Sequence, residues 1–135
     1  MENSLSMSFT FSKQERLHEF SLIRHVFSAG KVFSIPPFRV TWLKSTDNTD
    51  PCHKVMVSVP KALHARSTSR NMIKRRLREA YRLNKSILDE AGNQGDRKLV
   101  FCLIYTSKEI LSFSAIQDKI ILLLRRLKEE SEKGN

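Results

Sequence analysis

The chain has 135 residues, 40% of them hydrophobic, and a formal net charge of +10 at pH 7, which suits one domain with its own hydrophobic core and is short for two. An isoelectric point near 10.0 points to nucleic acid or an anionic surface as the partner. Because the sequence has no apolar run of roughly 18 residues and no signal-peptide pattern, we expect a cytoplasmic protein without a membrane partner.

The first third of the chain predicts a polar leader and one short helix. Residues 1–8 are polar and serine-rich, which is typical of a flexible segment. Ser12 and Glu15 have the spacing of a capping box, and Ser21 is a second candidate cap. An apolar stripe predicts a helix over residues 21–29 that stops at Gly30. The sequence leaves open whether this helix begins at Ser12 instead.

Three strands are predicted next. Residues 31–35 indicate a brief strand, residues 38–43 alternate between apolar and polar side chains, and residues 54–59 form a third strand that stops at Pro60. A turn-rich polar loop, residues 45–52, separates the second strand from the third.

The second half predicts helix, strand and helix. A long helix starts near residue 67, with serine and threonine at 67–69 as candidate N-caps. The apolar run at 99–105 fits a strand covered on both faces. A last helix begins at Ser114 and keeps an apolar stripe to about residue 128, so that 129–135 is expected to be a flexible tail. The order α-β-β-β-α-β-α predicts a single α+β domain over 9–128, a two-layer α/β sandwich with a four-stranded sheet.

The long helix has one apolar and one basic face. At about 100° per residue, its polar side spans an arc of roughly 140° made of Arg70, Asn71, Lys74, Arg75, Arg78, Arg82 and Lys85. Arg76 falls among the apolar positions and is expected to snorkel. Residues 61–85 contain nine Lys or Arg and one acidic residue, so like charges repel along the helix. A polyanion would remove this repulsion; a merely solvated basic face is the alternative.

The chain shows no pattern of a protein catalytic centre. Its glycines do not form a phosphate-binding loop, and its four histidines show neither zinc-ligand nor triad spacing. Cys52 and Cys102 lie far apart, which argues against a disulfide framework and suits a reducing compartment. Any catalysis linked to this chain is therefore expected to belong to a partner. Aromatic residues offer either a platform for unstacked bases or ordinary core packing: Phe9, Phe27, Phe38 and Trp42.

The run Arg70, Asn71, Lys74, Arg75 and Arg78 resembles the Arg-Asn-x-x-Lys-Arg-x-x-Arg signature of the protein subunit of bacterial ribonuclease P. Other segments agree with that family: residues 11–17, 26–31, 57–61 and 111–113. The resemblance covers roughly residues 9–128. The chain departs from many members in carrying Val-Pro-Lys and a longer connection before the signature, and Ile23 at an aromatic position of the first helix.

The resemblance implies the same fold, with a left-handed crossover between the third and fourth strands. It implies a protein that joins a catalytic RNA and promotes removal of 5′ leaders from precursor tRNA, with Mg²⁺ and hydrolysis supplied by the RNA and the protein itself monomeric. Residues expected to bind the catalytic RNA are Lys61, Arg66, Arg70, Asn71, Lys74, Arg75, Arg78 and Arg82. Residues expected to hold the leader are Phe9, Lys13, Arg16, Ile23, Phe27, Lys54 and a residue of the second strand, Thr41 or Trp42.

Three other classes compete with this interpretation. A structural RNA-binding protein, such as a ribosomal protein or an assembly factor, would use the same basic helix. An affinity for precursor tRNA that depends on the leader would distinguish the ribonuclease P protein from such a protein. A membrane-surface or calmodulin-type helix is disfavoured by few aromatic residues. A free-standing nuclease would have to cleave RNA without an RNA partner.

Overall fold

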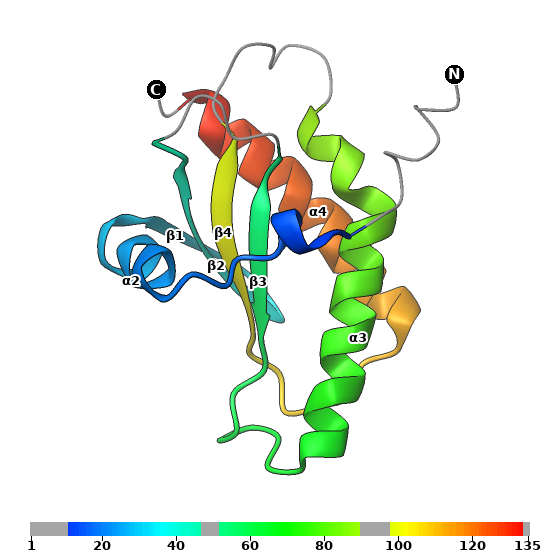
Figure 1. The fold of residues 1–135 in the computed structure, drawn as a ribbon. Coiled ribbons are helices and arrows are strands. Elements are labelled where there is room, and N and C mark those ends of the chain that lie inside the picture. Colours follow the sequence, from blue (N-terminus) through cyan, green and yellow to red (C-terminus); the bar gives the residue numbers. More distant parts are fainter. Residues whose placement is uncertain (1–10, 47–51, 90–97, 134–135) are drawn as a thin grey trace.

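Four strands form one mixed sheet in the order β1-β2-β4-β3 in the computed structural model, which describes residues 11–46, 52–89 and 98–133 (Figure 1). The strands are β1 (Lys31–Ile35), β2 (Phe38–Lys44), β3 (Lys54–Ser58) and β4 (Leu99–Tyr105). The helices are η1 (Lys13–Glu15), α2 (Phe20–Ala29), α3 (Ser67–Asn84), η2 (Lys85–Asp89) and α4 (Phe113–Lys133). The predicted element order and the four-stranded sheet are confirmed. The predicted leader, residues 1–8, lies outside the described residues.

β4 is the strand around which the sheet is built. It pairs antiparallel with β2 and parallel with β3, while β1 pairs with β2 and with no other described strand. All seven of its residues are buried, as expected of a strand covered on both faces. The parallel pairing makes α3 the crossover between β3 and β4. The left hand of this crossover stays a prediction from the resemblance.

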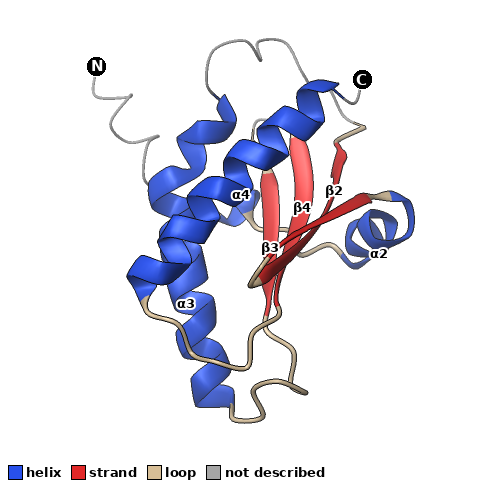
Figure 2. Cartoon of the chain, turned by 180° about the vertical axis from the view of Figure 1, so that it is seen from behind, coloured by secondary structure: helices blue, strands red, loops and turns tan. Residues whose placement is uncertain are grey.

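Helices cover the two faces of the sheet unequally. α3 and α4 lie on one face and α2 lies on the other (Figures 1 and 2). The larger core lies under α3 and α4 and includes Phe38, Val40, Trp42, Phe101, Leu103, Tyr105, Ile73, Leu77, Ile116, Ile120, Leu123 and Leu124. A smaller cluster lies under α2 and contains Leu17, Val26, Val100 and Cys102.

The helix starts differ from the sequence predictions. Ser12 and Glu15 do form a capping box, but it caps the separate turn η1, and α2 begins at Phe20 with Glu19 as N-cap. Ser21 is therefore not a cap. α3 has Arg66 at its N-cap without a capping side chain, so the predicted serine and threonine caps are wrong. They lie inside the first turn, where their hydroxyls are one or more positions too late to cap it.

α4 is longer than predicted at both ends. Its first turn is capped by Ser112, whose Oγ accepts a hydrogen bond from the Ala115 amide (3.2 Å), and it continues to Lys133. Two ion pairs one turn apart, Arg126–Glu130 and Lys128–Glu132, support the last turns. The predicted tail is therefore wrong for residues 129–133, because the alternating charges that suggested fraying pair along the helix.

Candidate nucleic-acid interface

The two faces of α3 are separated as the sequence predicts. Ile73, Leu77, Ala80 and Tyr81 are buried against the sheet and α4, while Asn71, Arg75 and Arg78 are exposed. The exposed side of the helix continues the basic connection that leads into it. This arrangement holds the cations on a rigid element, where their spacing is fixed by the helix.

Five cations of this region have neither an ion pair nor a side-chain hydrogen bond within the described part of the chain: Lys61, Arg66, Lys74, Arg75 and Arg78. Together with Asn71 they form what we call the α3 surface. Arginine guanidinium groups bind phosphate bidentately, so this surface suits the backbone of a nucleic acid.

Three other arginines of α3 are engaged within the protein. Arg70 Nη1 donates to the carbonyl oxygens of His64 (3.1 Å) and Ala65 (2.8 Å), so it orders the connection before the helix. Arg76 reaches out of the apolar side and donates to the Leu111 carbonyl (2.6 Å), as expected of a snorkelling side chain.

Arg82 is paired with Glu79 one turn away. Its Nη2 donates to Glu79 Oε2 at 2.5 Å, and this hydrogen bond lowers the pKa of Glu79 and raises that of Arg82. The charge of Arg82 is thus partly balanced within the helix. The positive charge that is not balanced in this way lies in the connection before α3 and along the helix as far as Arg78.

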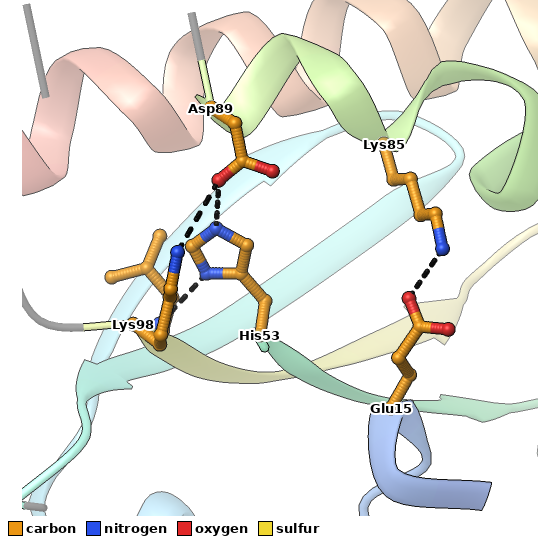
Figure 3. A network of polar contacts seen from close by, with 6 residues as sticks. Glu15, His53, Lys85, Asp89 and Lys98 are labelled. Atoms are coloured by element: carbon orange, nitrogen blue, oxygen red, sulfur yellow. Dashed lines mark hydrogen bonds and ion pairs between the residues drawn. The ribbon is translucent and has the colours of Figure 1, made fainter. Parts of the chain in front are cut away.

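Lys85, at the end of the predicted basic arc, is turned inward. Its Nζ donates to Glu15 Oε2, a contact drawn in Figure 3. The two atoms are 2.5 Å apart, and the side chains of Lys85 and Glu15 are only 13% and 9% exposed. Glu15 also accepts hydrogen bonds from the amide and the hydroxyl of Ser12. This ion pair connects the N-terminal segment to the end of α3. The two residues are 70 positions apart in the sequence, so no local sequence pattern could predict the contact.

A second polar network joins β3, η2 and β4 (Figure 3). The Leu99 amide donates to His53 Nδ1 (2.9 Å), so that nitrogen carries no proton, and Nε2 donates to Asp89 Oδ1 (3.0 Å). This hydrogen bond, reinforced by the charge of Lys98, holds the pKa of Asp89 below its usual value. Its role is structural, since it ties the ends of three elements together.

Three of the predicted leader residues line one pocket. Lys13, Arg16 and Lys54 surround a cavity of about 340 Å³ whose lining also includes Leu17, Glu19 and Leu22. We call it the Lys13 pocket. It lies on the α2 side of the sheet, because Lys54 shares a face of β3 with Met56, which packs on the cluster under α2.

The predicted leader residues of α2 lie elsewhere. Val26 is fully buried and packs in one cluster with Val100 and Cys102 of β4. At about 100° per residue, Ile23 and Phe27 fall on one flank of α2 and Leu22 falls on the other. Phe27 is 47% exposed. The Lys13 pocket and Phe27 are therefore separated by the helix, and they do not form one continuous groove across α2.

The two candidates on β2 are unsuitable for holding a leader. Thr41 and Trp42 are each 3% exposed. Trp42 belongs to the core under α4 and lies on the sheet face opposite to α2. Thr41 is on the α2 face, but its methyl group packs close to Gly30 beneath the helix. These two predictions are corrected by the pleat of the strand and by its central place in the sheet.

The other aromatic candidates also divide. Phe38 is buried in the core, so core packing is the correct interpretation for it, and Phe9 lies outside the described residues. Sequence reasoning missed Phe20, which is 73% exposed with the guanidinium of Arg24 over its ring. Its position seven residues before Phe27, two turns along one side of α2, was the available signal.

No group of three or more His, Cys, Asp or Glu residues in the described ranges could hold a metal ion. No helix there is long and apolar enough to cross a membrane.

These features define a class of protein: an α+β domain that presents an arginine-rich helix to a nucleic-acid backbone. The comparisons with known proteins identify the family. The Ribonuclease P family model matches residues 11–128, so the chain belongs to the ribonuclease P protein family.

Relatives and solved structures agree with this assignment. The chain is 33% identical over 110 residues to the ribonuclease P protein component of Porphyromonas gingivalis, covering 82% of this chain and 80% of that protein. A shorter match, 39% over 59 residues, is to the same component of Chlorobaculum tepidum, covering 41% and 38%. The RNase P protein of Staphylococcus aureus shares its fold with a TM-score of 0.67 and 20% identity, and the match covers 84% of this chain and 95% of that protein. The RNase P protein of Thermotoga maritima shares the fold with a TM-score of 0.66 and 23% identity, and the match covers 83% of this chain and 96% of that protein.

Proposed function

We propose that the chain is the protein component of a ribonuclease P ribonucleoprotein. In this role it binds the catalytic RNA and the 5′ leader of precursor tRNA and promotes endonucleolytic maturation of the tRNA 5′ end. Family membership supports the role, and the observation that carries it is the α3 surface, whose five cations lack acidic partners in the described residues. We propose a monomeric protein that acts in the cytoplasm.

The α3 surface is proposed to contact the catalytic RNA. Arg75 and Arg78 are exposed and can each grip a phosphate without breaking an internal bond. Arg70 would act more through the connection that its guanidinium orders. The leader is proposed to lie on the Phe27 flank of α2, where exposed aromatic rings can stack on unpaired bases.

Hydrolysis is assigned to the RNA with Mg²⁺. The protein attracts and orients RNA. Its cations lower the electrostatic repulsion between the catalytic RNA and its substrate. Such binding depends on counterion release and weakens as salt rises. The benefit of the protein should accordingly be greatest when little Mg²⁺ is present to screen the phosphates.

Cleavage of precursor tRNA by a bacterial catalytic RNA at low Mg²⁺, with and without the protein, tests the proposal. The wild-type protein should stimulate cleavage. The double variant Arg75→Ala/Arg78→Ala should stimulate cleavage less, and the slope of its log affinity for the catalytic RNA against log salt concentration should be smaller by about 2. Lys119→Ala/Arg125→Ala is the matched control, since it removes two exposed cations from α4. Binding without stimulation, even with the organism's own catalytic RNA, would favour a structural RNA-binding protein instead.

A further inference from the structure

We propose that His64 is a positioning residue for binding of the catalytic RNA: it fastens the connection between β3 and α3, residues 60–66, to the loop that follows β4. In that arrangement Lys61 and Arg66 occupy fixed places beside the start of α3. The proposal rests on the ribonuclease P function, because it concerns how the α3 surface meets RNA. It adds a residue that acts on RNA binding only through two cations of that surface.

His64 is the buried side chain of an exposed connection. Of residues 61–66, all of which the structure describes, His64 is 6% exposed and Leu63 is half-buried, while the other four are exposed. Burying a polar ring costs free energy unless the ring finds hydrogen-bond partners. A hydrophobic side chain could fill the same place without that cost, so packing alone does not explain a histidine here.

The ring of His64 is held from two sides. Its Nε2 lies 2.7 Å from the Ser107 carbonyl oxygen, and since a carbonyl oxygen can only accept, Nε2 carries the proton and donates it. The ring also packs against Tyr105 at the end of β4, with 5.8 Å between the ring centroids. The connection and the loop after β4 leave the sheet at the same end (Figure 1), because β3 and β4 are parallel.

The loop that carries the acceptor is itself fixed. Tyr105 is fully buried, and its hydroxyl donates to the Glu109 carbonyl (2.5 Å) and accepts from the Leu111 amide (3.3 Å). The Thr106 amide donates to the Pro37 carbonyl (2.7 Å). His64 therefore ties the connection to a loop that the sheet holds in place.

The backbone of His64 carries this anchor to the residues on both sides. Its amide and that of Leu63 both donate to the Pro60 carbonyl (3.1 Å each), which closes a turn that contains Lys61. Its own carbonyl accepts from Arg70 Nη1 (3.1 Å), which joins the connection to the first turn of α3. Cations that already stand in place lose less conformational entropy on binding phosphates than cations on a freely moving segment would.

Two variants of His64 test the hydrogen bond. The amide nitrogen of His64→Gln can take the place of Nε2, whereas that of His64→Asn is too short to reach the Ser107 carbonyl. At about 0.1 M salt, His64→Asn should weaken binding to the catalytic RNA about tenfold, and His64→Gln should stay within about twofold of the wild type. His53→Asn is the matched control, since it removes the other buried histidine, at the opposite end of β3, and should leave this affinity unchanged. Circular dichroism confirms that each variant is folded.

The decisive measurement repeats His64→Asn in a protein that already carries Lys61→Ala/Arg66→Ala. That double variant alone should lower the salt slope of catalytic-RNA binding by about 2, and adding His64→Asn should then cost less than about twofold. A loss of about tenfold in both backgrounds would mean that His64 does not act through these cations. That result, wild-type affinity of His64→Asn, or wild-type affinity of Lys61→Ala/Arg66→Ala would each overturn the proposal.

Trypsin digestion of the free wild-type protein gives a check that needs no folded variant. A fixed connection should resist cleavage after Lys61 and Arg66, and mass spectrometry of the early fragments shows whether it does. Cleavage at either site before any other would overturn the proposal. The variant Arg75→Ala/Arg78→Ala tests the ribonuclease P function itself and does not involve His64, so the function and the positioning role can fail separately.

Discussion

The pair between Glu15 and Lys85 should be one of the strongest single polar contacts in the domain. Both side chains are more than four-fifths buried, and Glu15 also holds the amide and hydroxyl of Ser12. Removing one partner of a buried pair costs about 3–5 kcal/mol, because the other charge stays in a poorly solvated place. We expect about 3 kcal/mol for Lys85→Met, since Ser12 still supports the carboxylate.

A double-mutant cycle isolates the interaction. Lys85→Met, Glu15→Gln and the double variant are unfolded with urea at pH 7 and followed by circular dichroism. The double variant should be more stable than the sum of the single losses predicts, by at least about 1 kcal/mol. Lys128→Met and Glu132→Gln form the control cycle, because that pair lies along α4 with one side chain 37% exposed and should couple by about 0.3–0.5 kcal/mol. Equal coupling in both cycles would refute the reasoning.

Three further outcomes follow from packing and titration. Gly30→Ala should destabilise the protein by about 3 kcal/mol in urea unfolding, because an added Cβ overlaps backbone carbonyl oxygens. The hydrogen bond from His53 lowers the pKa of Asp89. The ionised Asp89 side chain therefore contributes its full stabilisation above about pH 4, and this stabilisation is lost as the pH falls through the lowered pKa. Asp89→Asn should make the free energy of unfolding depend less on pH in that acid range. Burial raises the pKa of the Cys102 thiol to about 11, so iodoacetamide at pH 8 should label the half-buried Cys52 and spare Cys102, as peptide mapping can show.

The elements were largely predictable because local patterns dictate them. The apolar run at 99–105 fits a strand buried on both faces, and α3 separates its apolar and basic sides by helical periodicity alone. Arg76 broke that periodicity, and the structure explains the exception by a carbonyl acceptor at Leu111. The end of α4 was predicted wrongly because a charged helix end held by ion pairs and a frayed, charged tail have similar amino-acid compositions.

The sequence predicted which cations belong to the candidate site, but it did not predict which of them lie together in the structure. Which flank of α2 a side chain occupies depends on how the helix meets the sheet, and this orientation separated Phe27 from the Lys13 pocket. The pleat of β2 likewise decided that Trp42 faces the larger core. Contacts between distant segments fix these arrangements, so residue types and spacing alone did not contain them.

The central place of β4 has a consequence for synthesis on the ribosome. Among the described strands, β3 pairs only with β4, and β2 has only β1 until β4 is inserted between β2 and β3. The sheet therefore cannot close until residue 105 has left the exit tunnel, while the basic helix is made well before. During that interval its cations emerge beside ribosomal RNA with no finished domain behind them, so chains truncated before β4 should be retained on polyanions and degraded rather than released as a smaller folded unit.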